Sequence, residues 1–131
     1  MVEEIELDDD MDRNDFSTFI YDNNDIIIFK FGAEWCNPCL KIKPYIKNKL
    51  IELGCIPTDK KIKYCEINVD DNIDIYSSFK KAKMIKGIPH MLCYFGENNE
   101  RRGKYYLADI TVSGSNEKEL DSFFNLIISK L

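Results

Sequence analysis

The apolar run at residues 26–31 constrains the fold of this chain more than any other segment. Successive side chains of a strand point to opposite faces, and here both alternating sets are apolar except for Lys30. Such a run predicts a central strand that is covered on both sides, which is typical of α/β proteins. The length of 131 residues is enough for one hydrophobic core, so we expect a single domain spanning residues 1–131.

Other segments predict further strands. Residues 62–69 predict a second buried strand, and residues 2–7 predict a short edge strand within an acidic N-terminal lead-in. Residues 91–95 and 105–112 predict an antiparallel hairpin across a turn rich in Gly and Asn at residues 96–103.

Helical spacing of apolar side chains predicts four helices. The first spans residues 12–21, the second runs from the cysteines at positions 36 and 39 to about Leu53, and the third spans residues 73–83. The fourth is C-terminal, and its apolar face includes positions from Leu120 to Leu131. Gly54 is expected to cap the second helix and Pro44 to kink it. Asn116 and Glu119 predict a capping box for the last one. The order β-α-β-α-β-α-β-β-α indicates a mixed central β-sheet with helices on both faces, after an acidic lead-in at residues 1–10.

Composition excludes several classes of function. The net charge of −5 argues against a general affinity for nucleic acid or anionic membranes. No run approaches the roughly 18 apolar residues needed to span a membrane. The acidic N-terminus lacks the features of a signal peptide, so we expect a cytoplasmic protein. We also expect it to be a monomer. In a reducing compartment, we expect the five cysteines of the chain to be free thiols or to include a catalytic pair, rather than to form a framework of structural disulfides.

Cys36 and Cys39 lie where the strand at residues 26–31 gives way to a helix. The unpaired amides and the positive dipole end of a helix start favour a thiolate. A free cysteine with a pKa near 8.5 is about 3% ionised at neutral pH, whereas one with a pKa of about 7 is half ionised. The spacing therefore predicts a redox-active disulfide. A zinc site is disfavoured, because zinc takes four ligands and the chain has no second CxxC.

The surrounding motif is Ala33-Glu34-Trp35-Cys36-Asn37-Pro38-Cys39, and it is accompanied by Pro44, Asn68-Val69-Asp70 and Gly87-Ile88-Pro89. In these motifs, over nearly its whole length, the chain resembles the thioredoxin family, from whose Ala-Glu-Trp-Cys-Gly-Pro-Cys it differs only at Asn37. The resemblance implies a thioredoxin-like fold and no bound cofactor beyond the redox-active disulfide. It also implies disulfide-containing protein substrates and an electron donor such as a thioredoxin reductase or a glutathione system.

The resemblance implies that Cys36 is the exposed nucleophile and Cys39 the buried resolving thiol. The predicted helix gives the same assignment, because Cys36 lies at its start and Cys39 lies beneath, in its first turn. The resemblance further implies that Pro89 is a cis-proline beside the cysteines and that the backbone of Ile88 pairs with an extended substrate peptide.

Lys30 and Glu66 depart from the family, which usually has a carboxylate at the first position and a lysine at the second. A buried ammonium is costly without a partner, and Glu66 on the next strand is the obvious one. One hypothesis is that the pair tunes Cys39, with Glu66 accepting its proton through water and Lys30 favouring its thiolate. The other is that Lys30 snorkels or forms a structural ion pair.

Other positions near the cysteines also bear on function. The resemblance implies that Trp35, Asn37 and Pro38 support the cysteines. In the family the two residues between the cysteines set the redox potential, so Pro38 implies a reducing character, whereas Asn37 leaves the potential open. His90 either touches substrate, stabilises a thiolate near Cys36, or forms part of the groove wall. Leu40 makes the rim beside the cysteines more apolar.

The three other cysteines are not expected to take part in the reaction. Cys65 and Cys93 lie on predicted strands and are expected in the core. Cys55 follows Gly54 and is expected to be exposed, either as a tolerated loop residue or as a thiol that is glutathionylated or dimerises.

We therefore expect an enzyme, a thiol–disulfide oxidoreductase that reduces protein disulfides through Cys36 and Cys39. An oxidase or isomerase in a disulfide-forming relay would use the same site in the other direction. A protein-binding module would instead use the acidic lead-in and the turn at residues 96–103 as partner surfaces. The reduction potential separates the first two functions, since about −270 mV favours a reductase and values well above −200 mV an oxidant.

Overall fold

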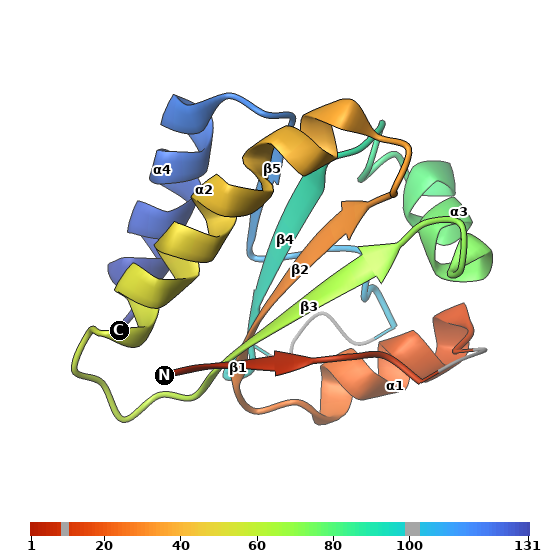
Figure 1. Ribbon diagram of the computed structural model, residues 1–131. Coiled ribbons are helices and arrows are strands. Elements are labelled where there is room, and N and C mark those ends of the chain that lie inside the picture. Colours follow the sequence, from red (N-terminus) through yellow and green to blue (C-terminus); the bar gives the residue numbers. More distant parts are fainter. Residues whose placement is uncertain (9–10, 99–102) are drawn as a thin grey trace.

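The computed structural model in Figure 1 describes residues 1–8, 11–98 and 103–131. These residues form a five-stranded sheet in the order β1-β3-β2-β4-β5. The central strand β2 pairs in parallel with β3 and antiparallel with β4, while β1 and β5 form the two edges. The strands are β1 (Val2–Ile5), β2 (Ile26–Gly32), β3 (Ile62–Asn68), β4 (His90–Phe95) and β5 (Ile110–Ser113).

Helices cover both faces of this sheet, which confirms the predicted fold class and element order. They are α1 (Arg13–Asp22), α2 (Asn37–Gly54), α3 (Ile73–Lys81) and α4 (Glu117–Ile128). Figure 1 shows α2 and α4 on one side of the sheet and α1 and α3 on the other. No helix in the described ranges is long and apolar enough to cross a membrane.

The core consists of two hydrophobic clusters, one on each face of the sheet, because the side chains of β2 alternate between the two faces. Ile26 and Ile28 pack with apolar side chains of α2 and α4, whereas Ile27, Phe29 and Phe31 pack with those of α1 and α3. Every residue of β2 before Gly32 is buried, Lys30 included. The predicted central strand is therefore confirmed, and it carries Lys30 into the core.

The helix ends agree with the sequence only in part. The Asn116 side chain caps α4 by accepting a hydrogen bond from the Glu119 amide at 3.1 Å. This is one of the two hydrogen bonds of the predicted capping box. The predicted cap at Gly54 is wrong, because Gly54 is the last residue of α2 and Cys55 is the cap. A Cβ on Gly54 would lie 3.3 Å from Met1 Cα. The absence of a side chain at position 54 is therefore explained by the close approach of the N-terminal segment.

The predicted hairpin is also shorter than expected, because β5 begins only at Ile110 rather than at Tyr105. The Tyr105 ring turns into the core and lies 5.9 Å from the Phe16 ring and 5.7 Å from the Phe79 ring. Asp109 accepts a hydrogen bond from the Phe95 amide at 2.7 Å, which ties this irregular segment to the end of β4. Residues 9–10 of the acidic lead-in and residues 99–102 of the predicted turn lie outside the described residues.

Candidate active site

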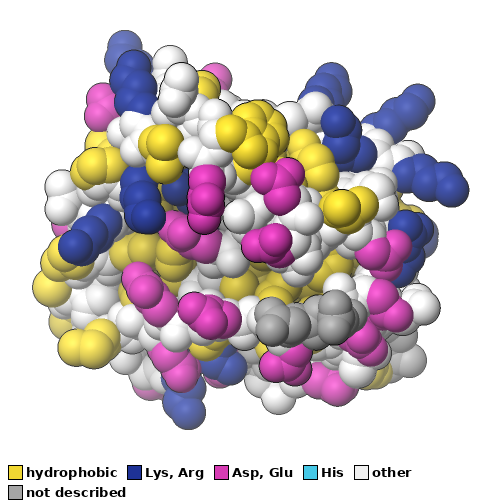
Figure 2. Space-filling view, turned by 45° about the vertical axis from the view of Figure 1, so that its right-hand side comes forward, with side chains coloured by type: hydrophobic (Ala, Val, Ile, Leu, Met, Phe, Trp, Pro, Cys, Tyr) yellow, Lys and Arg dark blue, Asp and Glu magenta, His cyan; other side chains and the backbone are white. Residues whose placement is uncertain are grey.

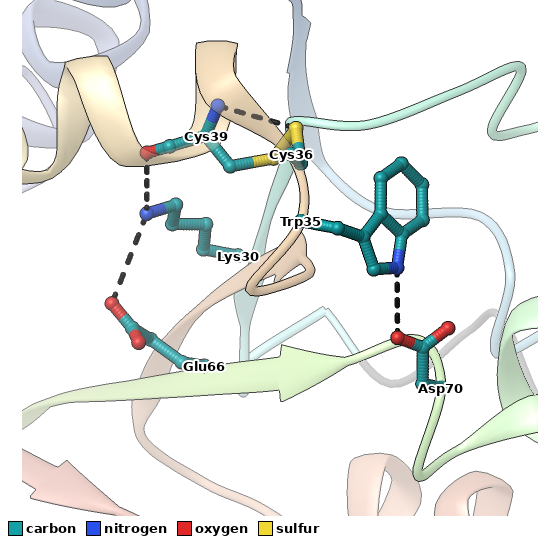
Figure 3. Close-up of a disulfide and its surroundings, with 6 residues drawn as sticks. All are labelled: Lys30, Trp35, Cys36, Cys39, Glu66 and Asp70. Carbon is teal, nitrogen blue, oxygen red and sulfur yellow. Dashed lines mark hydrogen bonds and ion pairs between the residues drawn. A yellow bond between two sulfur atoms is a disulfide. The ribbon is translucent and has the colours of Figure 1, made fainter.

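A disulfide joins Cys36 and Cys39, as expected (Figure 3). Cys36 is the N-cap of α2, and its sulfur accepts a hydrogen bond from the Cys39 amide at 3.2 Å. Residues at this position face the unpaired amides and the positive dipole end of the helix. This end of α2 therefore stabilises negative charge on the Cys36 sulfur.

The expected difference in exposure between the two cysteines is not present in the disulfide form. Cys36 is 4% exposed and Cys39 is 3% exposed. The Cys36 sulfur is directed back over the first turn of α2, towards the Cys39 amide, and this explains its burial. The position at the helix start, rather than exposure, distinguishes the two residues.

The intervening residues fit the start of a helix. Asn37 and Pro38 are exposed and begin α2. Proline is well tolerated there, because its missing amide would have no partner within the helix. Pro44 lies further inside the same helix.

Trp35 precedes the cysteines and is largely exposed. Its Nε1 donates a hydrogen bond to the Asp70 carboxylate at 2.8 Å (Figure 3). Asn68 in turn accepts a hydrogen bond from the Asp70 amide at 2.9 Å. Asp70 was not among the predicted site residues, although the Asn68-Val69-Asp70 motif ends a strand that runs parallel to β2, on the same side as the cysteines.

Lys30 and Glu66 are direct neighbours in the pairing of β2 with β3, so the predicted pair is confirmed. The Lys30 side chain is 6% exposed, and its Nζ lies 3.9 Å from Glu66 Oε1. The same Nζ donates a hydrogen bond of 3.4 Å to the Cys39 carbonyl, as Figure 3 shows. Glu66 is 51% exposed, and it accepts a hydrogen bond from the Tyr64 hydroxyl at 3.1 Å.

Burial lowers the pKa of Lys30, and the nearby Glu66 carboxylate partly opposes this shift. Lys43 lowers the pKa further by repulsion. Burial also raises the pKa of Tyr64 far above its usual range, so that its hydroxyl stays a donor to Glu66.

A cleft of about 320 Å³ opens beside Cys39, and its lining includes Lys30, Gly32, Lys43 and Glu66. Leu40 is exposed at this cleft, as expected for an apolar rim. Cys39 therefore has a route to solvent despite its burial. Figure 2 shows the molecule turned by 45° from Figure 1, and on this face hydrophobic side chains lie among Asp and Glu side chains.

The peptide bond between Ile88 and Pro89 is cis, which confirms this expectation. Pro89 directly precedes β4, whose first residue, His90, pairs with Phe31 of β2. Pro89 therefore lies at the end of β2 from which the chain leads to Cys36. The Pro89 carbonyl accepts a hydrogen bond from the Gly114 amide at 2.9 Å, which fixes the loop to the segment after β5.

His90 is 6% exposed, and neither ring nitrogen has a hydrogen-bond partner within the described ranges. Burial lowers its pKa to about 4. His90 pairs with Phe31 and alternates with Leu92 and Tyr94, which lie in the cluster under α1 and α3. Its burial does not support direct contact with substrate, which stays a prediction.

We expect His90 to make the protein less stable in mild acid. An unfolded histidine takes up a proton near pH 6.5, whereas folded His90 does so only near pH 4. Between these values the unfolded chain binds more protons, so the free energy of unfolding falls as the pH is lowered. The expected loss is about 2 kcal/mol between about pH 7.5 and about pH 5.

Urea unfolding of wild type and a His90→Leu variant at several pH values measures this effect. The variant should lose most of the dependence between about pH 7 and about pH 5. Equal pH dependence in the two proteins would show that His90 is not the responsible group.

The remaining thiols lie where they were expected. Cys65 and Cys93 are buried and Cys55 is exposed. Burial raises the pKa of Cys65 to about 12, so that this thiol stays protonated and unreactive.

The sequence and the fold are similar to those of known proteins. A sequence model of the thioredoxin family matches residues 9–123. Thioredoxin 3 of Plasmodium falciparum is 35% identical over 101 residues, which are 77% of this chain. The match covers 47% of that relative, so the chain corresponds to about half of its length.

Solved structures agree with this result. The crystal structure of a Plasmodium falciparum thioredoxin aligns with a TM-score of 0.59 at 30% identity, and covers 93% of this chain and 84% of the other. The thioredoxin of Trypanosoma brucei brucei aligns with a TM-score of 0.68 at 16% identity, over 97% of this chain and 92% of the other. At that identity the second structure supports the fold alone.

Proposed function

Because this chain belongs to the thioredoxin family, we propose that it is a protein-disulfide reductase that transfers electrons through Cys36 and Cys39. The observation that carries this proposal is the disulfide between the N-cap of α2 and the first turn of the same helix. A closed disulfide at a helix start is the oxidised product of such a reaction, and the same pair of sulfurs is the donor when reduced.

The first step uses Cys36 as the nucleophile. Its thiolate is favoured by the Cys39 amide at 3.2 Å and by the dipole of α2. The thiolate attacks one sulfur of a substrate disulfide, so that a mixed disulfide forms and the other substrate sulfur leaves as a thiolate.

The second step uses Cys39. Its thiolate attacks the Cys36 sulfur, the Cys36–Cys39 bond forms, and the bond from Cys36 to the substrate breaks. The substrate has then gained two electrons, and its two thiolates take protons from solvent. The cysteine pair is oxidised, so an electron donor must reduce it before the next turnover.

The residues around the disulfide have supporting roles in this proposal. Ile88 and Pro89 present backbone to an extended substrate peptide, and Trp35, held by Asp70, forms part of the exposed surface beside Cys36. Asn37 and Pro38 set the redox potential of the disulfide, because they lie within the loop that it closes.

Partners and location follow from the chemistry. We propose that disulfide-containing proteins are the substrates and that a thioredoxin reductase or a glutathione system supplies electrons. The chain would act as one monomeric thioredoxin-like domain in the cytoplasm, a reducing compartment that suits its three thiols outside the disulfide.

The reduction of insulin with dithiothreitol as donor, together with the reduction potential in glutathione buffers, tests the proposal. Catalysed reduction and a potential near about −270 mV are the expected results. A potential well above about −200 mV would instead assign an oxidase or isomerase. A folded wild type that leaves insulin intact would overturn the proposed activity and favour a binding module.

A further inference from the structure

Lys30 is the one charged side chain that the central strand carries into the core, and it lies beneath the disulfide (Figure 3). Its Nζ makes a single hydrogen bond within the described part of the chain, to the Cys39 carbonyl at 3.4 Å. An ammonium group has three donors, and the contact with Glu66 at 3.9 Å is too long for a hydrogen bond. Among the described residues, Lys30 therefore has one hydrogen-bond acceptor and one ion-pair partner, and its side chain lines the cleft beside Cys39.

The Cys39 sulfur and the Lys30 side chain both border the small space that Gly32 leaves open. A Cβ on Gly32 would lie 3.5 Å from Cys39 Sγ and 4.0 Å from Lys30 Cε. The sulfur and the methylene group next to the ammonium thus face the same small space, which belongs to the cleft beside Cys39. In Figure 3 the Lys30 ammonium is directed towards the Cys39 carbonyl rather than towards the sulfur, so it would act on a Cys39 thiolate through its charge and not through a hydrogen bond.

A cation at this place would favour the second step of the proposed reaction. A buried thiol resists ionisation, because the thiolate loses its hydration. In the disulfide form Cys39 carries no charge, and among the described residues Lys30 forms an ion pair with the Glu66 carboxylate at 3.9 Å. Once the disulfide is opened, a Cys39 thiolate would add a second anion near Lys30.

We infer that Lys30 is a positioning residue that stabilises the Cys39 thiolate when the disulfide is open. This inference rests on the proposed function, and it gives the chain a buried cation as the partner of its resolving sulfur. The Cys39 proton leaves through the cleft, where Glu66 faces Lys30. The thiolate then attacks Cys36, the Cys36–Cys39 bond forms, and the substrate departs as a thiolate; Lys30 is neither oxidised nor consumed.

Other charged or titratable groups also surround this site. They are Glu66 and Tyr64 from β3, Cys36 and Lys43 from α2, and Glu34 from the loop before α2. The partner of Lys30 in β4 is Met91, which does not titrate. Lys43 carries the same charge as Lys30 and lines the same cleft but is exposed to solvent, so it offers a matched control.

The test compares the pKa of Cys39 in a Cys36→Ser background with and without Lys30→Met. The pKa is read from ultraviolet thiolate absorbance and from the pH dependence of alkylation by iodoacetamide. Loss of the buried cation should raise the pKa of Cys39 by about one unit, so that alkylation at a fixed pH below the pKa slows about tenfold. Lys43→Met should change the rate less than about threefold, because water screens its charge.

A second variant separates charge from hydrogen bonding. Lys30→Gln keeps a donor for the Cys39 carbonyl but removes the charge, and it should behave like Lys30→Met. If Lys30→Gln matches the parent protein, or if neither neutral variant slows alkylation in a folded protein, the inference is overturned. These measurements need no protein substrate, so they stand apart from the insulin assay that tests the proposed function.

Discussion

The Cys39→Ser variant is expected to react once with a protein disulfide and then stop. Cys36 keeps its position at the start of α2 and still attacks the substrate, but no second sulfur is available to open the mixed disulfide. Turnover in the insulin assay should fall by about a thousandfold or more, as is usual when a member of a catalytic unit is removed. Mass spectrometry should detect the substrate covalently attached to Cys36.

Cys36→Ser is the matched control for this experiment. It should lose turnover to a similar extent but should accumulate no mixed disulfide, because the position at the start of α2 that favours a thiolate belongs to Cys36 and not to Cys39. A trapped substrate in Cys36→Ser but not in Cys39→Ser would reverse the roles assigned to the two cysteines.

The Gly96→Ala variant is expected to be strongly destabilised. A Cβ on Gly96 would lie 2.2 Å from the Asn24 carbonyl carbon and 2.5 Å from Asn24 Cα. Both contacts are with backbone, so relief requires a shift of the segment between α1 and the central strand. The Gly96 amide also donates a hydrogen bond of 3.1 Å to the Asp25 carbonyl, which such a shift would disturb. We expect a loss of about 3 kcal/mol or more in the free energy of unfolding.

Urea unfolding measures this loss, and Gly87→Ala provides the control. No atom of the described residues lies within 4 Å of a Cβ at Gly87, so its variant should stay within about 0.5 kcal/mol of wild type. Equal stability of the two variants would mean that the close approach of Gly96 to Asn24 does not constrain the fold.

The large-scale fold could be predicted from the sequence because it depends on local patterns. The run at residues 26–31 is apolar on both faces, and it became the central strand. The cysteines could be placed at a helix start for the same reason. The pairing of Lys30 with Glu66 was expected from the resemblance to the thioredoxin family, and β2 and β3 place the two residues opposite each other.

Other features depended on contacts between distant segments. Tyr105 was expected in a strand, but its ring packs against Phe16 of α1 and Phe79 of α3. The strand β5 begins only at Ile110. Gly54 was expected to cap α2, but it makes room for the N-terminal segment. Neither neighbour is close in sequence, so no local pattern could have indicated these contacts.

The sequence alone thus determined the chemistry and the general position of the cysteine pair, because strand alternation, helical spacing and a CxxC motif are local properties of the chain. Only the tertiary structure decided the surroundings of that pair. It buried Cys36 as deeply as Cys39, joined Trp35 to Asp70, and placed His90 in the core. These outcomes arise where separate strands and helices meet, and the burial and partners of a side chain are fixed only by that packing.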